Sequence, residues 1–132
     1  MSQENVEIVQ QVIDTWNRGD RRAWLELADE HVEFFPMRAA LEGNAYRGHD
    51  GLRQFLVDVD EDWEYIHLDL GGMRDIGDQV VVLARWNARG RGSGVELHTD
   101  VGIVLTVRGS KFVEFRFFSD PGEALEAVGL SE

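Results

Sequence analysis

The spacing of apolar residues changes once along this chain, and that change constrains the fold more than any other feature. Before Trp63 they recur mostly every three or four residues, as in amphipathic helices. From Trp63 onward they alternate with polar residues, as in half-buried strands. A chain with helices first and strands afterwards is typical of an α+β domain, in which the helices pack on one face of the sheet.

The helical half predicts three helices. The first is capped by Ser2 and ends at Gly19, the second and shorter one is capped by Asp20, and the third starts at His49 or Asp50. Between the last two, the segment HVEFFP predicts a short strand, and MRAALEGNAYRG predicts an irregular loop that is a candidate lid.

The second half predicts an antiparallel meander. Its strands are expected near residues 64–73, 79–90, 95–108 and 111–119. The segment DPGEALEAVGL predicts a short final helix with Asp120 as its N-cap. No repeat, linker or low-complexity segment divides the sequence, so we expect one domain across residues 1–132.

Charge and cysteine content exclude several classes of function. There are 25 acidic and 13 basic residues, a formal charge of -12 that repels phosphate backbones and anionic lipids. We therefore expect neither a nucleic-acid nor a membrane partner. The absence of cysteine excludes a disulfide framework and a cysteine nucleophile. The first residues are acidic and amphipathic, unlike a signal peptide, and this predicts a cytoplasmic protein.

Four polar side chains interrupt an otherwise apolar pair of strands. Arg85 and Asn87 share one face of the first strand, and His98 and Asp100 share one face of the next. If RGSG is the turn between them, Asn87 lies opposite His98 and Arg85 lies opposite Asp100, with Cβ atoms about 5 Å apart. The four then form one polar patch. A slip of one residue, which the neighbouring glycines make easy, would separate the two pairs.

Four segments of the sequence resemble the SnoaL-like branch of the nuclear transport factor 2-like superfamily. They are NRGDRRAWLELADEHVEFFP, YRGHDGLRQF, GDQVVVLARWNARGRGSG and VRGSKFVEFRFFSDPGEALEAVGL. The resemblance implies a cone-shaped α+β barrel, in which three N-terminal helices and a curved, mainly antiparallel sheet enclose one apolar cavity, usually in a homodimer. The superfamily includes polyketide cyclases, ketosteroid isomerases, limonene epoxide hydrolases, scytalone dehydratases and non-catalytic domains, so it specifies the fold better than the chemistry.

The resemblance also suggests which face of the sheet meets the cavity. Catalytic residues of limonene epoxide hydrolases fall near Arg85, Asn87 and Phe117, and a cavity acid of ketosteroid isomerases falls near Gly102. This assigns the face with the polar patch to the cavity. The opposite face carries an apolar row that a second subunit would cover, and we expect a homodimer through it. The row consists of Val82, Ala84, Trp86, Val101, Ile103 and Leu105.

The catalytic acids of those relatives are replaced here. Asn87 and Phe117 stand in the place of the hydrolase aspartates, and Gly102 stands in the place of the isomerase acid. The proton-shuttling aspartate of the isomerases is replaced by Phe34 or Phe35. None of those mechanisms therefore transfers intact.

The polar patch predicts acid/base chemistry of its own. Asp100 and His98 would form the acid/base pair, Arg85 would orient the substrate electrostatically, and Asn87 would hold water or substrate. The alternative is that Arg85 and Asp100 form an ordinary ion pair at an exposed hairpin end.

The remaining candidates are aromatic. Trp16, Tyr46, Phe55 and Phe117 could contact a ligand, although aromatic residues of this kind more often pack in a core. No spacing of histidines or carboxylates predicts a metal site, and we expect no cofactor. The sequence thus predicts an isomerase, cyclase, epoxide hydrolase or dehydratase acting on an apolar, oxygenated small molecule. The alternative is a non-catalytic dimeric binding domain of the same fold.

Overall fold

The helices form where the apolar spacing predicts them. The computed structural model describes residues 2–36 and 45–130. Within these ranges the helices are α1 (Ser2–Asn17), α2 (Arg21–Glu26), α4 (Gly48–Asp62) and α5 (Pro121–Ala127). Asp20 caps α2 as expected, because its side chain accepts a hydrogen bond from the Ala23 backbone N–H at 3.2 Å. Asp120 caps α5 in the same way.

The strands form one mixed sheet in the order β2-β1-β6-β5-β4-β3. They are β1 (Ala28–Phe35), β2 (Tyr46–Arg47), β3 (Trp63–Ile76), β4 (Gln79–Gly90), β5 (Glu96–Arg108) and β6 (Lys111–Phe118). Strands β3 to β6 are the expected antiparallel meander, and β1 runs parallel to β6. The expected lid falls mostly at 37–44, outside the described residues, while Tyr46 and Arg47 pair with β1.

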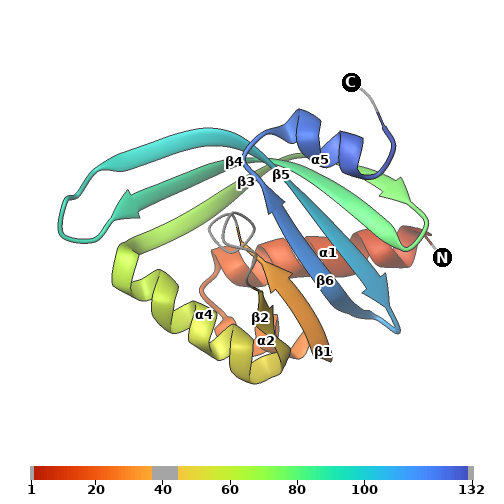
Figure 1. The fold of residues 1–132 in the computed structure, drawn as a ribbon, viewed down its shortest axis with the longest axis horizontal. Coiled ribbons are helices and arrows are strands. Elements are labelled where there is room, and N and C mark those ends of the chain that lie inside the picture. Colours follow the sequence, from red (N-terminus) through yellow and green to blue (C-terminus); the bar gives the residue numbers. More distant parts are fainter. Residues whose placement is uncertain (1, 37–44, 131–132) are drawn as a thin grey trace.

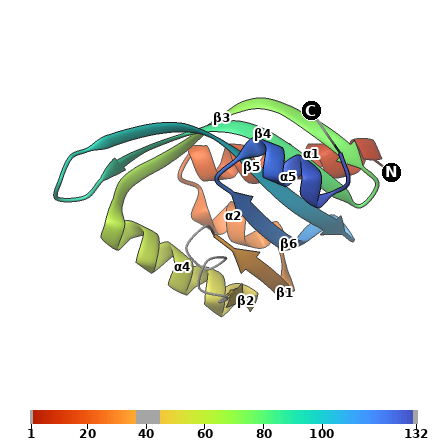
Figure 2. The same cartoon turned by 45° about the horizontal axis from the view of Figure 1, so that its top comes forward.

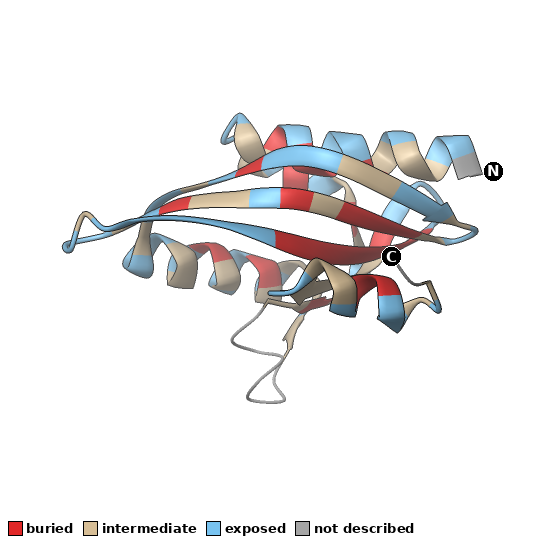
Figure 3. Ribbon diagram, turned by 90° about the horizontal axis from the view of Figure 1, so that it is seen from above, coloured by how far each residue is buried: buried red, intermediate tan, exposed pale blue. Residues whose placement is uncertain are grey.

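The sheet curves around the first three helices, which confirms the expected α+β architecture. Helices α1, α2 and α4 lie on its concave side, and α5 lies on its convex side (Figure 1). The end of the β4–β5 hairpin extends beyond the helices α1 and α2 (Figure 2). Burial is accordingly concentrated in the parts of these strands away from the hairpin end (Figure 3).

An apolar cluster lies on each side of the sheet. On the concave side Val9, Val12 and Leu52 of the helices pack with Val82 and Ile103 of the sheet, all buried. On the convex side α5 covers a smaller cluster, formed by Val81, Val104, Ala124 and Leu125. The sheet is therefore apolar on both faces because the chain's own helices cover both.

The apolar row that was expected on the outer face lies on the concave face, so that assignment is wrong. Members such as Val101, Ile103 and Leu105 are buried in the larger cluster, against the helices of the same chain. They cannot form an interface with a second subunit while those helices cover them. A homodimer stays a prediction, but it would need other surfaces.

Two arginines fix the C-terminal end of α4. Arg21 of α2 donates to both carboxylate oxygens of Asp60, at 2.7 and 2.8 Å, and lies over the Trp16 ring. Arg91, in the β4–β5 turn, donates from Nε to the Asp60 carbonyl at 2.5 Å and from a terminal nitrogen to the Trp63 carbonyl at 3.2 Å. The last turn of α4 is thereby joined to α2 and to the hairpin.

We predict that Gly102→Ala destabilises the fold by displacing α5. A Cβ at Gly102 would lie 2.5 Å from the Ala124 Cβ and 3.2 Å from the Pro121 Cα, so α5 must shift. Overpacking of this kind costs about 1–3 kcal/mol in the free energy of unfolding, measurable by urea titration. The control is Gly72→Ala, where a Cβ meets only a flexible arginine end at 3.9 Å. Equal stability of the two variants would contradict the close approach of α5.

We predict a small, pH-dependent coupling between Arg21 and Asp60. The hydrogen bond from Arg21, aided by the charges of Arg21 and Arg91, lowers the pKa of Asp60 below its ordinary value. The side chains are 39% and 51% exposed, so solvent screening limits the coupling to about 0.5 kcal/mol. Because the folded-state pKa is depressed, this stabilisation is present above the unfolded pKa and is lost as the pH falls through the folded pKa.

The measurement is a double-mutant cycle with Arg21→Ala and Asp60→Asn, unfolded in urea at pH 7 and again near pH 3. The cycle cancels the packing of Arg21 on Trp16, which the single variant also removes. A coupling energy that is unchanged at the lower pH would contradict the assigned ion pair.

Candidate functional site

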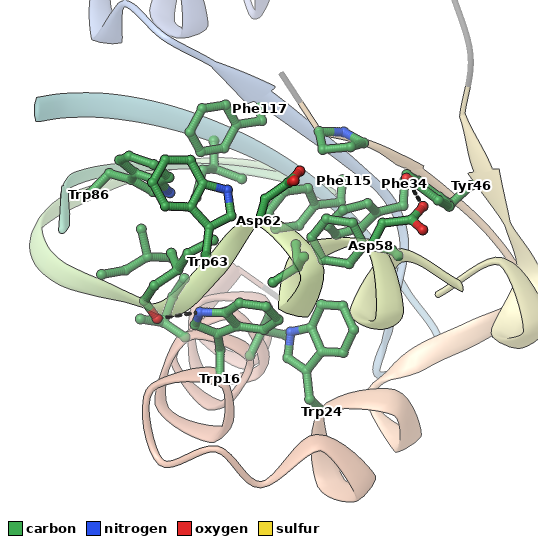
Figure 4. A pocket seen from close by; sticks show the side chains of 18 residues that line it. Trp16, Trp24, Phe34, Tyr46, Asp58, Asp62, Trp63, Trp86, Phe115 and Phe117 are labelled. Carbon is green, nitrogen blue, oxygen red and sulfur yellow. Dashed lines mark hydrogen bonds between the residues drawn. The ribbon is translucent and has the colours of Figure 1, made fainter. Parts of the chain in front are cut away.

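A cavity of about 330 Å³ lies between the concave face of the sheet and helices α1, α2 and α4. All four tryptophans of the chain line it. The complete lining is Val12, Ile13, Trp16, Trp24, Phe34, Pro36, Tyr46, Phe55, Asp58, Val59, Asp62, Trp63, Ile66, Leu68, Trp86, Ile103, Phe115 and Phe117 (Figure 4). A largely apolar cavity with a few polar groups is the ordinary form of a small-molecule site.

Aromatic rings in the wall hold one another in place. Phe34 and Phe115 stack with centroids 4.3 Å apart, and Trp63 meets Trp86 edge to face at 5.0 Å. The indole N–H of Trp16 donates to the Ile66 carbonyl at 2.9 Å, so its polar edge is satisfied within the protein. These contacts define a rigid apolar surface for the body of a ligand.

The polar side of the cavity comes from α4. Asp58 and Asp62 lie one helical turn apart, on the face of α4 that borders the cavity. The Tyr46 hydroxyl donates to Oδ2 of Asp58 at 2.6 Å (Figure 4), and the Gln54 amide donates to Oδ1 at 2.8 Å. Strand β2 supplies Tyr46 because it pairs with β1 just before α4 begins. A phenol and a carboxylate at this distance can exchange a proton.

The acidic residues of α4 occur where a helix normally favours the opposite charge. The segment DVDED ends α4, and its last turn contains no basic residue. Carboxylates at a helix C-terminus face the negative end of the helix dipole, which is destabilising. Asp60 is paired with Arg21. Asp58 and Asp62 border the cavity. Asp58 and Asp62 were not among the site residues predicted from the sequence, although an acidic run at the end of a predicted helix was a signal for them.

The four aromatic residues expected to contact a ligand all line this cavity. Trp16 comes from α1, Tyr46 from β2, Phe55 from α4 and Phe117 from β6. The structure thus brings together side chains that are widely separated in the sequence. Their contact with a ligand stays a prediction.

The polar patch forms as the sequence predicts but lies on the convex face. Asn87 pairs with His98 and Arg85 with Asp100, which confirms the expected register. The expected place in the cavity is wrong, because Trp86, between Arg85 and Asn87, is the side chain that enters it. Gly102 likewise faces α5 and not the cavity.

The patch residues bind one another at the surface. Arg85 donates to Asp100 at 3.2 Å, and these side chains are 51% and 71% exposed. His98 Nδ1 lies 2.6 Å from the Asn87 side-chain oxygen, and the Asn87 amide donates to Asp69 at 3.0 Å. This is the exposed hairpin arrangement of the alternative interpretation. The acid/base roles predicted for His98 and Asp100 required a place in the cavity, and these side chains do not line it.

Two further observations concern the described residues only. Within 2–36 and 45–130, no group of three histidine, aspartate or glutamate side chains is placed to hold a metal ion. In the same part of the chain, no helix has the length and apolar character needed to cross a membrane.

We predict that the ion pair on the convex face contributes little to stability. A double-mutant cycle with Arg85→Ala and Asp100→Ala, measured by urea unfolding at neutral pH, should give a coupling of at most about 1 kcal/mol because the pair is exposed. Removing one partner of a buried ion pair costs about 3–5 kcal/mol. A coupling energy of that size would contradict the exposed placement of Arg85 and Asp100.

Solved structures share this fold at low sequence identity. An NTF2-like protein of unknown function from Burkholderia pseudomallei matches with a TM-score of 0.79 and 19% identity, over 96% of this chain and 98% of that chain. TerC, co-crystallised with polyporic acid, matches with a TM-score of 0.78 and 21% identity, over 95% of this chain and 98% of the TerC chain. A "putative polyketide cyclase" from Xanthomonas campestris pv. campestris matches with a TM-score of 0.77 and 20% identity, over 97% of this chain and 98% of that chain.

Sequence comparison assigns the family. No curated protein sequence matches the chain. The SnoaL-like domain, in contrast, matches residues 9–115, from within α1 into β6. Since this match covers most of the sequence and the structure has the corresponding α+β fold, the protein belongs to the SnoaL-like domain family.

Proposed function

We propose that this protein is an enzyme that binds a small, largely apolar ring compound in the aromatic cavity and acts on it by acid/base chemistry. The observation that carries the proposal is the 2.6 Å hydrogen bond from Tyr46 to Asp58 in the cavity wall. The reaction class is that of a cofactor-independent isomerase, cyclase, hydrolase or dehydratase, each of which moves protons at an oxygenated carbon skeleton.

Tyr46 and Asp58 can act as a two-step proton relay. The Tyr46 oxygen takes a proton from the substrate while the Tyr46 hydroxyl proton passes to Asp58. The substrate is left as its conjugate base, and the return of both protons completes an isomerisation or releases a leaving group. Gln54, which donates to the other oxygen of Asp58, holds the carboxylate in the orientation that accepts from Tyr46.

The aromatic lining supports an apolar ring as the body of the substrate. The rings of Trp63, Trp86 and Phe117 offer flat surfaces that favour stacked or edge-on contact with another ring. Solved structures with the same fold include two described as "putative SnoaL-like polyketide cyclase", and this name is in keeping with a carbon-ring ligand.

A non-catalytic binding domain is the second candidate. It is favoured by the chemistry of the described lining, which contains no histidine and places its ionisable groups on one side only. In that case the Tyr46–Asp58 pair would orient a ligand without transferring a proton.

Proton exchange in a neutral bicyclic ketone tests the proposal without knowledge of the natural substrate. The probe is 2-tetralone in D₂O, with exchange at its α-carbon followed by NMR. General acid–base catalysis contributes about 10²–10⁴-fold, so we expect the wild type to accelerate exchange by about 100-fold and Asp58→Asn to lose most of this. Tyr46→Phe should lose a similar part, because the relay begins at its hydroxyl.

The control variant is Asp75→Asn, which makes the same change of charge on an exposed part of β3. It should exchange like the wild type. Equal exchange by the wild type and Asp58→Asn would contradict the catalytic proposal. Binding of 2-tetralone without accelerated exchange would favour the non-catalytic alternative.

A further inference from the structure

The ionisable side chains of the cavity lining indicate which charge its ligand carries. This inference rests on the cavity being the binding site proposed above. Among the described lining residues, the ionisable groups are Asp58, Asp62 and Tyr46. No arginine, lysine or histidine of the described chain is part of that lining. No cationic side chain of the described lining therefore offsets the charge of Asp58.

The charge of Asp58 is met only by neutral donors among the described residues. Its two oxygens accept from the Tyr46 hydroxyl and the Gln54 amide, and no described cationic side chain forms an ion pair with it. Asp58 is half-buried beside aromatic rings. A carboxylate in such surroundings is costly, and a positive charge placed next to it recovers part of that cost.

Two described arginines near the C-terminal end of α4 are directed away from Asp58. Arg21 uses its two terminal nitrogens on Asp60, and Arg91 donates to backbone carbonyls of Asp60 and Trp63. The chain thus places two cations at the C-terminal end of α4 and gives neither to Asp58. The negative end of the helix dipole adds to the field of the carboxylates on the cavity side.

Aromatic faces complete a site for a cation. In Figure 4 the carboxylates of Asp58 and Asp62 lie among the rings that line the cavity. The faces of tryptophan, tyrosine and phenylalanine rings attract ammonium groups, most strongly when water is excluded. An ammonium group near α4 would meet the Asp58 carboxylate on one side and ring faces on the other, while the apolar body of the ligand packs against the sheet.

We infer that the ligand of this cavity carries a positive charge, as a protonated amine or quaternary ammonium group on an apolar ring skeleton. A neutral ring compound enters the same cavity more weakly. An anionic one is disfavoured, because it would bring a second negative charge close to Asp58 and because the whole chain, at -12, repels it.

Three compounds with one apolar body and different charges test the inference. They are 1-adamantanemethylamine, which is an ammonium ion at pH 7, 1-adamantanemethanol and 1-adamantanecarboxylate. None of them fluoresces, and all four tryptophans line the cavity, so intrinsic fluorescence reports binding directly. We expect the ammonium compound to bind about tenfold or more tightly than the alcohol, and the carboxylate to bind more weakly than the alcohol.

Substitution of Asp58 tests whether this carboxylate is the cause. In Asp58→Asn the preference for the ammonium compound should fall to about threefold or less, while the affinity for the alcohol stays within about twofold. Asp58→Glu keeps the charge and should keep the preference. Asp75→Asn, with the same change in net charge as Asp58→Asn but on an exposed part of β3, should bind all three compounds as the wild type does.

The outcomes separate this inference from the proposed function. If the alcohol binds and the ammonium compound binds no more tightly, the inference is overturned and the apolar cavity site stands. A preference that persists unchanged in Asp58→Asn also overturns it. If none of the compounds and no 2-tetralone changes the tryptophan fluorescence, the binding site itself is contradicted, and the inference with it.

Discussion

The alternation of side chains along β4 and β5 is the constraint on which the rest of this structure depends. Each strand sends one set of residues to the helices α1, α2 and α4 and the other set to the convex face. The first set builds the core and one wall of the cavity, ending in Trp86. The second set is apolar only where α5 covers it, and becomes polar at Arg85 and Asn87, beyond the reach of α5. The wall of the proposed site and the exposed polar patch are thus separated by a single residue of register.

The cavity persists because its opposite wall, helix α4, is held at two points along its length. Helix α4 packs on β1 through Leu52 and Leu56 near its middle, and Arg21 and Arg91 join its last turn to α2 and to the hairpin turn. Large rings such as Trp63 and Trp86 support one another across the space between α4 and the sheet. A helix fixed at both points cannot move inward to fill that space, so an apolar cavity remains in an otherwise close-packed interior.

Local patterns predicted most of the fold. The change of period at Trp63 placed the helices before the strands, and the glycine-rich turn placed Arg85 opposite Asp100. These predictions succeeded because periodicity and turn chemistry act over a few residues. The face of the sheet could not be decided in the same way, since both faces are apolar and only the packing of α5 distinguishes them. Positions matched to hydrolases and isomerases then favoured the wrong face.

The candidate site was missed for a related reason. Polar residues in a strand attracted attention because they broke an apolar pattern, whereas Asp58 and Asp62 occur in a helix where polar residues alternate with apolar ones as usual. Their unusual feature is their position relative to the helix dipole, and that becomes visible only when the end of the helix is known. A helix that ends in DVDED loses stability at its own C-terminus, and Arg21 and Arg91 recover some of it without reaching Asp58. Asp58 accepts instead from the neutral groups of Tyr46 and Gln54, and this arrangement is the basis of the cationic ligand that we propose.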